Sequence, residues 1–250
     1  MTRPLLLLLC WLLLSPWVWA EASRDFDGVD DAVNFGSPAD LDNQEPFSLL
    51  AWIYPDTTGE SGVGTIFNKD SGSTGWWYFL LGATNTIQFS KDYTGGGSVD
   101  LNRVASDESI TLGAWNYVVL TWDGSTTAAN VLMYVNGTGT TYKTTTNGVG
   151  TKGSDASNSL FSGGYSTGIR TFDGQICYDQ FADRVITAVE ILEAMWKPDS
   201  LGLNLIGFWP IWGSNSPEID LSASANTGTL TGTTASANGP PVMFGDGLPL

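Results

Sequence analysis

The sequence predicts an all-β protein, a β-sandwich of two antiparallel sheets with one short surface helix. Short runs of alternating or continuous apolar residues are separated by clusters of Gly, Asn, Asp, Ser and Thr, which is the spacing of a sandwich and not of alternating strands and helices. A single segment has both the apolar period and the capping residues of a helix. No repeat of roughly 20 to 50 residues is visible, which argues against propellers and solenoids.

The chain opens on a segment typical of a secretory signal peptide. Residues 1–20 combine a basic start, a Leu-rich run and small residues up to Ala20. Pro16 interrupts the run, and the apolar stretch falls short of the roughly 20 residues that a membrane-spanning helix needs. We therefore expect cleavage after Ala20, a secreted, periplasmic or cell-surface protein, and no membrane insertion of the mature chain. The domain is expected over residues 21–231, with a Gly/Pro-rich C-terminal tail over 232–250.

Residues 115–122, WNYVVLTW, are largely apolar on both faces of the strand that they predict. Successive strand residues point to opposite sides of a sheet, so a half-buried strand would alternate apolar and polar side chains. This strand should therefore be covered on both sides. Val118, Leu120 and Trp122 are expected between the two sheets, and Trp115, Tyr117 and Val119 on the other face, under loops or the helix.

A tight hairpin is predicted at Asn136 and Gly137, which join the runs VLMYV and TTYKTT. Both residue types adopt positive φ readily, as a two-residue hairpin turn requires. Asn136, Gly137 and Thr138 also form a glycosylation sequon, but the turn explains these residues without a glycan.

The one predicted helix lies in TAVEILEAMWKP, residues 187–198. Thr187 and Glu190 have the spacing of a capping box, and Pro198 ends the helix. The apolar stripe of Val189, Leu192, Met195 and Trp196 is expected to face the sandwich, with Glu190, Glu193 and Lys197 outward.

Composition excludes several classes of function. The net charge of −16, from 26 acidic and 10 basic residues, repels phosphate backbones and anionic membranes, so nucleic acid is not an expected partner. The chain has no His, which removes Ser-His-Asp and Cys-His catalysis and imidazole metal sites. Cys177 is the only cysteine after the signal segment, and we interpret it as a small buried hydrophobe.

The run DFDGVDDAVNF gathers four carboxylates, Asp25, Asp27, Asp30 and Asp31. Calcium prefers oxygen ligands, so a structural calcium could bind here. The alternative is a tight turn of polar residues before the next strand. Both interpretations stay open.

Aromatic side chains form the second candidate site, because flat rings pack against the apolar faces of sugars. Trp76 and Trp77 are adjacent in a predicted strand, so at most one of them points into the core. Tyr93 and Tyr165 lie in Gly-rich loops. We take Trp76, Trp77, Tyr93 and Tyr165 as candidate glycan-binding residues, with burial in the core as the alternative for each.

Four blocks, FDGVDDAVNFG, FSLLAWIYPD, WNYVVLTWDG with VLMYVNG, and FDGQI with FADRVITAVEILEAMW, follow one another in order. They resemble laminin-G-like and pentraxin-like domains of the concanavalin A-like lectin and glucanase superfamily. The resemblance implies a jelly-roll of two antiparallel sheets with the capped helix near the last long strand. The block IGFWPIWGSNSPEIDLSASANTGTLTG looks like the opening segment of many such domains. Here it closes the chain, so LIGFWP is expected beside the first strands.

The same resemblance limits the function. The calcium-binding residues of pentraxins precede the strand that matches FDGQI, where this chain has SGGYSTGIRT, without a carboxylate. The alternating Glu-Asp-Glu strand of the glucanase branch has no counterpart. We therefore expect a non-catalytic secreted module that binds a glycan or glycoprotein. The alternatives are a structural or adhesive surface protein that self-assembles or binds protein partners and, last, a polysaccharide hydrolase.

Overall fold

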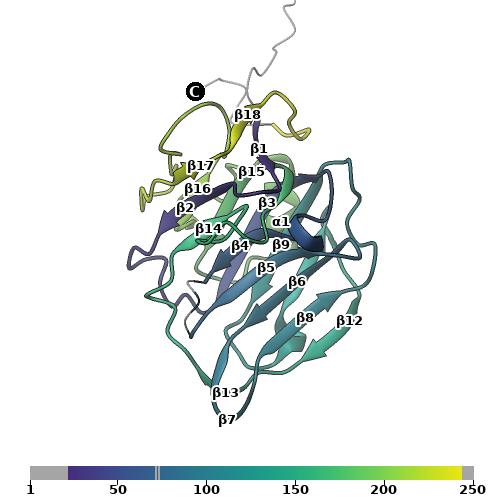
Figure 1. Ribbon diagram of the computed structural model, residues 1–250, viewed down its shortest axis with the longest axis vertical. Helices are drawn as coiled ribbons and strands as arrows, with labels where there is room; N and C mark the ends of the chain where they lie inside the picture. The colour runs from purple at the N-terminus through teal and green to yellow at the C-terminus, as the bar shows by residue number, and fades with distance from the viewer. Residues whose placement is uncertain (1–21, 71, 73, 244–250) are drawn as a thin grey trace, which may run out of the picture.

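The computed structural model describes residues 22–70, 72 and 74–243 (Figure 1). The predicted signal peptide lies outside the described residues. Within them the chain forms two large antiparallel sheets packed face to face, a two-stranded ribbon and one α-helix. The predicted jelly-roll sandwich is thus confirmed.

One sheet, here called the covered sheet, has β15 near its middle. Its strands, in spatial order, are β11 (Thr138–Gly139), β10 (Leu132–Val135), β9 (Asn116–Trp122), β3 (Phe47–Pro55), β15 (Asp173–Ala182), β1 (Ser23–Asp27) and β18 (Thr234–Ser236), with β16 (Gly207–Trp209) also paired to β15.

The second sheet, here called the open sheet, is built mainly from the middle of the chain. Its order is β12 (Tyr142–Thr146), β8 (Leu101–Ala105), β6 (Thr86–Lys91), β5 (Trp77–Gly82), β4 (Val63–Lys69), β14 (Leu160–Ser162), β2 (Ala32–Gly36) and β17 (Thr229–Thr231). The ribbon pairs β7 (Tyr93–Val99) with β13 (Val149–Lys152). The helical segments are α1 (Ala188–Trp196) and the short 3-10 turns η1 (Glu60–Gly62), η2 (Ala128–Asn130) and η3 (Gly202–Asn204).

The main core fills the space between the two sheets and is centred on Phe47. This ring meets Trp77, Phe89, Trp122 and Phe181 at centroid distances of 5.1, 6.0, 5.5 and 5.4 Å. Tilted and edge-to-face pairs of this kind contribute about 0.5–1.5 kcal/mol each beyond area burial. Aromatic rings from β3, β9 and β15 of the covered sheet thereby pack against rings from β5 and β6 of the open sheet.

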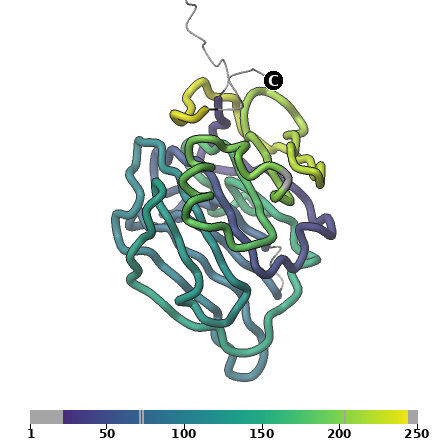
Figure 2. Tube along the Cα trace, turned by 180° about the vertical axis from the view of Figure 1, so that it is seen from behind, coloured from purple at the N-terminus to yellow at the C-terminus, as the bar shows by residue number. Residues whose placement is uncertain are grey.

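A second apolar cluster covers the opposite face of the covered sheet. Tyr117 and Val119 of β9 lie there with Ile191 and Met195 of α1, whereas Val118, Leu120 and Trp122 lie in the main core. Figure 2 shows the green segment that includes α1 crossing this face from behind. The expectation that the strand 115–122 is covered on both sides is confirmed.

Cys177 belongs to the second cluster and is fully buried. Burial raises the pKa of its thiol well above the ordinary value. Its interpretation as a buried hydrophobe is confirmed.

The helix begins as predicted but is rotated relative to the prediction. Thr187 and Glu190 form the capping box, which satisfies backbone donors at the N-terminus. The buried residues are Ile191, Ala194 and Met195, whereas Val189, Leu192 and Trp196 are exposed. Apolar residues lie on nearly all sides of this helix, so its sequence alone does not define the buried face. Packing against the second cluster buries Ile191, Ala194 and Met195. The described helices include none that is both long and apolar enough to cross a membrane.

The turn at Asn136 and Gly137 is confirmed, but the run TTYKTT is not the partner of VLMYV. β10 pairs with the short β11, and β12, which contains most of that run, pairs with β8 in the open sheet. Val135 pairs with Thr138, and the two residues between them, Asn136 and Gly137, have φ of 50° and 76°. Gly137 therefore adopts the positive φ that the turn requires.

The C-terminal segment is part of the sandwich beyond the predicted boundary at residue 231. β17 pairs with β2, and β18 pairs with β1. β16 pairs with β15 along the edge that β1 also uses, which places LIGFWP near the first strands as expected. The expected loose tail over 232–250 is wrong for residues 234–236, because the free edge of β1 supplies hydrogen-bond partners for them.

Candidate functional site

The outer face of the open sheet lies at the front of Figure 1 and has no α-helix across it. Strand register brings one row of side chains across this face: Thr229, Asn34, Phe161, Asn68, Tyr78, Ser90, Asn102 and Thr146. Val33, Phe79 and Phe89, at adjacent positions, lie in the main core, so the row points away from it. Asn68, Ser90 and Phe161 of this row are buried, whereas Asn34, Tyr78, Asn102 and Thr146 are partly exposed.

A groove of about 470 Å³ opens at the β17 end of this row. It is lined by Asp30, Ala32, Asn34, Ser157, Ser159, Phe161, Tyr165, Ser166, Gly168, Thr229 and Thr231. Ligand sites in proteins combine apolar surface with a few polar groups that fix orientation. Phe161 and Tyr165 supply the apolar surface here, and the hydroxyls and Asn34 supply the polar groups.

The loop between β14 and β15 forms one wall of the groove. Gly163 starts this loop at a φ of 75°, where a Cβ would collide with the ring of Phe26. Asn68 then donates to the carbonyl of Gly164, and both the backbone N–H and the hydroxyl of Thr65 donate to the carbonyl of Arg170 at 2.8 Å. The loop is thus fixed to β4 at both ends.

Tyr165 and Arg170 of this loop also line a second hollow of about 220 Å³ with Asp70, Ser166 and Ile169 among its other lining residues. Tyr165 and Ser166 line both spaces. Arg170 Nη1 donates to the Tyr165 hydroxyl at 2.9 Å. Burial raises the pKa of Tyr165 to about 12, so this phenol keeps its proton at neutral pH.

The four predicted aromatic residues do not form one exposed surface. Trp77 and Tyr93 are 2% exposed and lie in the main core, so their rings offer no platform to a ligand. Trp77 points inward because the strand alternation leaves Trp76 and Tyr78 outward. Trp76 is partly exposed and stacks on Tyr78, with 5.1 Å between ring centroids and 1° between planes. Tyr165 is 7% exposed but lines the groove.

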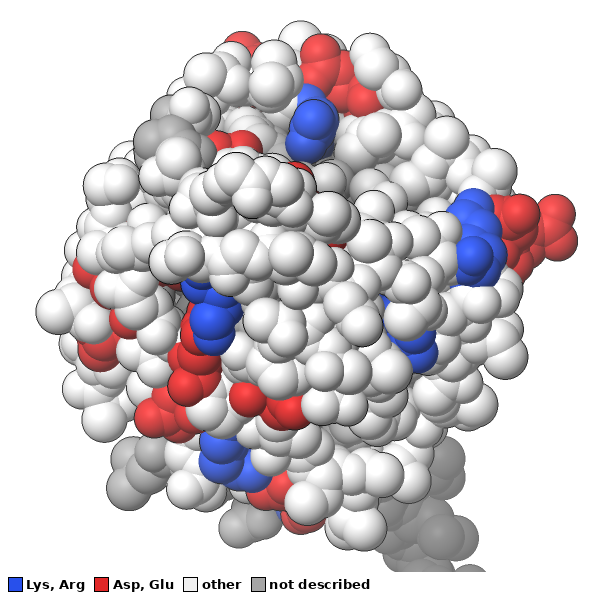
Figure 3. Space-filling view, turned by 90° about the horizontal axis from the view of Figure 1, so that it is seen from below, with Lys and Arg blue, Asp and Glu red and all other residues white. Residues whose placement is uncertain are grey.

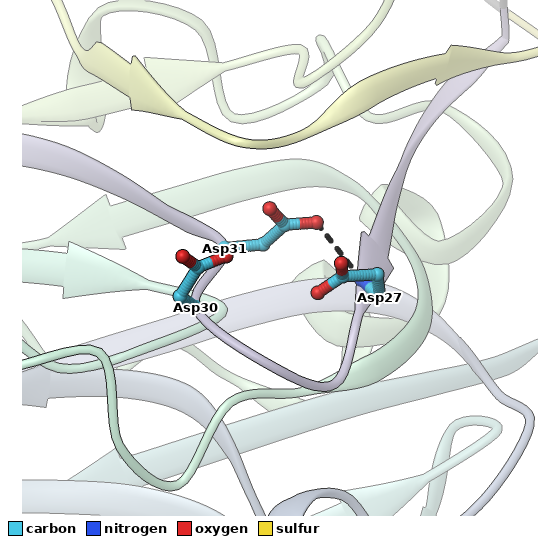
Figure 4. A group of neighbouring side chains, drawn as sticks. All are labelled: Asp27, Asp30 and Asp31. Atoms are coloured by element: carbon cyan, nitrogen blue, oxygen red, sulfur yellow. Dashed lines mark hydrogen bonds between the residues drawn. The ribbon is translucent and has the colours of Figure 1, made fainter.

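Three of the four predicted metal-binding aspartates lie together at the end of β1 and on the turn that follows it (Figure 4). Asp27, Asp30 and Asp31 each offer a carboxylate oxygen within 4.8 Å of the others. Burial, and then the neighbouring negative charges, raise the pKa of Asp31, whose carboxylate accepts the backbone N–H of Asp27 at 2.8 Å. The three could supply part of the six to eight oxygen ligands of calcium.

Asp25 does not join this group. Its carboxylate accepts a hydrogen bond at 2.8 Å from Gln175 on the paired strand β15. Asp25 lies within β1 opposite Gln175, and this pairing directs its side chain across the sheet.

Sequence reasoning missed Asn34, Phe161 and Arg170. Asn34 and Phe161 pair only through the register of β2 and β14. Arg170 stands in SGGYSTGIRT, where the two glycines next to Tyr165 signal a sharply turned loop. That signal could have drawn attention to the cation beside the tyrosine.

Residues 27–192 match the family model Laminin_G_3, described as the concanavalin A-like lectin/glucanases superfamily. The chain belongs to this family. Family membership agrees with the two antiparallel sheets and with the resemblance in the four ordered blocks. No curated protein matches the sequence.

Two solved structures share the fold of this chain at low identity. A candidate carbohydrate-binding protein from Bacteroides ovatus has a TM-score of 0.61 and 16% identity, covering 89% of this chain and 62% of that chain. A NanB sialidase from Streptococcus pneumoniae has a TM-score of 0.51 and 14% identity over 68% of this chain and 27% of that one. A heptameric SAP-like pentraxin from Limulus polyphemus has a TM-score of 0.48 and 17% identity over 70% of this chain and 81% of that one. The chain therefore spans about three fifths of the Bacteroides protein.

Proposed function

We propose that this chain is a secreted, non-catalytic carbohydrate-binding module that holds a glycan on the outer face of the open sheet. The groove of about 470 Å³ beside Phe161 and Tyr165 carries the proposal. Its hydroxyl and amide groups can bind sugar hydroxyls, and the small exposed parts of Phe161 and Tyr165 add apolar contact. The fold shared with a candidate carbohydrate-binding protein supports the same assignment.

The carboxylates around the groove support the non-catalytic part of the proposal. Glycosidases need two carboxyl groups that flank one bond, with one kept protonated. Asp30 is the one carboxylate that lines the groove among the described residues. Asp31 has a raised pKa, but it is buried and faces the backbone of Asp27. A purified protein that released reducing ends from polysaccharides would contradict this part of the proposal.

A glycan array with the chain from residue 21 onward tests the binding function. Binding to a defined glycan should weaken at least tenfold in Asn34→Ala or Phe161→Ala. Asn130→Ala is the matched control, because Asn130 lies in η2, which contacts β8 and β12 at the other end of the open sheet. Absence of binding to every glycan, or equal weakening in all three variants, would contradict the proposal.

A second candidate is adhesion through protein contact. The exposed stripe of Val189, Leu192 and Trp196 on α1 favours it, since contiguous apolar surface often marks an interaction site. Sizing of the purified protein separates the two functions. A monomer that binds glycans supports the first, and an ordered oligomer without glycan affinity supports the second.

Secretion is the remaining element of the proposal and rests on residues 1–20 alone. Intact-mass measurement of protein recovered from the medium or periplasm should give a chain that begins at Glu21. A chain that retains residues 1–20 would contradict it.

A further inference from the structure

Five of the nine Lys and Arg side chains in the described residues are paired with carboxylates of this acidic chain. Most of the Lys and Arg side chains on the face in Figure 3 touch Asp or Glu. In the described residues, five cations form ion pairs with carboxylates: Arg24, Lys69, Lys143, Lys152 and Arg184. Lys91 is buried against backbone carbonyls, and Arg103 lies 3.5 Å from the centre of the Tyr142 ring. Arg170 and Lys197 remain without a carboxylate partner in this part of the chain.

Of these two, Arg170 lies at the candidate site. Its guanidinium carbon is 5.2 Å from the ring centre of Tyr165 and 5.7 Å from that of Tyr78. Tyr78 in turn stacks on Trp76. Cation–π contacts of this geometry hold the charge over aromatic faces without neutralising it. The guanidinium is therefore fixed in place and still exposed.

The hydrogen-bond donors of Arg170 are mostly unused. A guanidinium has five N–H donors in a planar fork, and one bond, from Nη1 to the Tyr165 hydroxyl, is made to the described protein. The side chain lines the hollow of about 220 Å³ that adjoins the groove through Tyr165 and Ser166. A carboxylate in that hollow would match the fork with two parallel hydrogen bonds.

The rest of the surface limits how much negative charge a ligand can carry. The net charge is −16, and Asp70 and Asp30 line the hollow and the groove. A densely sulfated polymer would meet these charges along its whole length, whereas one carboxylate can contact Arg170 and leave neutral sugars on the rest of the face.

We propose that Arg170, positioned by Tyr165, binds the carboxylate of an acidic sugar within an otherwise neutral glycan. This inference rests on the proposed function and names the ligand class of the same site. Tyr165 is a positioning residue here, since its hydroxyl orients the guanidinium.

Matched ligand pairs test the inference on the unaltered chain from residue 21 onward. The probes are sialyllactose against lactose, and a neutral oligosaccharide bearing one glucuronic acid against its carboxyl-reduced form, with a heparin fragment as a polyanion. We expect at least one acidic member to bind roughly tenfold or more tightly than its neutral match, as charged hydrogen bonds permit. Heparin should bind more weakly than that acidic member.

Four variants test whether Arg170 causes the preference for the acidic member of a ligand pair. Arg170→Gln should remove it, and Arg170→Lys should keep only part, since an ammonium lacks the planar fork. Tyr165→Phe keeps the ring and should reduce the preference without abolishing neutral-glycan binding. Lys197→Gln makes the same change of charge at the other unpaired cation and should leave the preference intact. Unchanged thermal unfolding verifies that each variant is folded.

The outcomes separate this inference from the proposed function. Equal binding of acidic and neutral members, or a preference that survives Arg170→Gln, would overturn the carboxylate site and leave glycan binding standing. Tightest binding to heparin would also overturn it. No binding to any member of either pair would overturn the inference and count against the proposed function as well.

Discussion

Arg24 in the first strand and Glu218 in the closing segment form a buried ion pair, with 3.2 Å between Arg24 Nε and a carboxylate oxygen. Both side chains are almost fully buried. The other carboxylate oxygen of Glu218 accepts the backbone N–H of Ile211 at 3.0 Å. The pair joins the two ends of the domain, which β18 and β1 also bring together.

Removing Arg24 should therefore destabilise the whole domain. Arg24→Ala leaves Glu218 buried and unpaired, which costs about 3–5 kcal/mol in comparable pairs. The free energy of unfolding in urea measures this loss. Lys143→Ala is the control, because its pair with Asp107 is exposed, and its urea midpoint should stay unchanged. Equal shifts in both variants would contradict a special role for the buried pair.

Asp179 of β15 should make stability depend on pH. It is fully buried, and neither carboxylate oxygen has a well-aligned partner in the described residues. Burial raises its pKa well above 3.8, while Glu218 adds to the shift and Ser162 opposes it. The unfolded chain has the lower pKa and so loses this proton first as pH rises. The contribution of Asp179 is then fully present below about pH 4 and is lost as pH rises toward the folded-state pKa.

Asp179→Asn tests this dependence, because an amide mimics the protonated acid. The variant should equal the wild type near pH 4 and gain stability over it toward pH 7, by at most about 1.4 kcal/mol per pH unit. Urea unfolding at several pH values gives the difference. Asp107→Asn, which replaces an exposed carboxylate whose pKa is lowered by Lys143, should show no such gain. A constant difference across this range would rule out a raised pKa at Asp179.

The rotation of α1 makes a prediction about its apolar residues. Ile191 is fully buried in the second cluster, and Val189 is 74% exposed. Ile191→Ala should cost about 2–5 kcal/mol, as for other buried large-to-small changes. Val189→Ala should change stability by less than about 0.5 kcal/mol. Thermal and urea unfolding measure the loss of stability in each variant. A larger loss in Val189→Ala than in Ile191→Ala would support the buried stripe that the sequence predicted.

Calcium should raise the melting temperature if Asp27, Asp30 and Asp31 bind it. A ligand at 100 times its dissociation constant adds about 2.7 kcal/mol, or roughly 2–4 °C for each kcal/mol in a domain of this size. Thermal unfolding with calcium and with EDTA measures the shift. Asp30→Asn should abolish the shift without disturbing the hydrogen bond that the backbone N–H of Asp27 donates to Asp31, and Asp107→Asn should retain the shift. If calcium does not raise the melting temperature of the wild type, the aspartates are explained as polar residues of a tight turn and not as a calcium site.

The sequence determined the features that depend on neighbouring residues. The capping box of Thr187 and Glu190, the turn at Asn136 and Gly137, and the double coverage of residues 115–122 are all present. Each follows from spacing along the backbone, where turn geometry and strand alternation act within a few residues. The grouping of Asp27, Asp30 and Asp31 is local in the same way.

Only the tertiary structure decided which face of an element is buried and which distant residues meet. Trp77 is buried because Phe47 and Phe181 of the covered sheet pack against it, and Tyr93 of the ribbon lies in the same core. Asp25 contacts Gln175 through the pairing of β1 with β15. Arg170 lies near Tyr78 only because the loop after β14 is fixed to β4. Such contacts join segments far apart in sequence, and no local pattern encodes them. The sequence therefore predicted which types of residue would form the site, and the tertiary structure determined which individual residues of those types lie together.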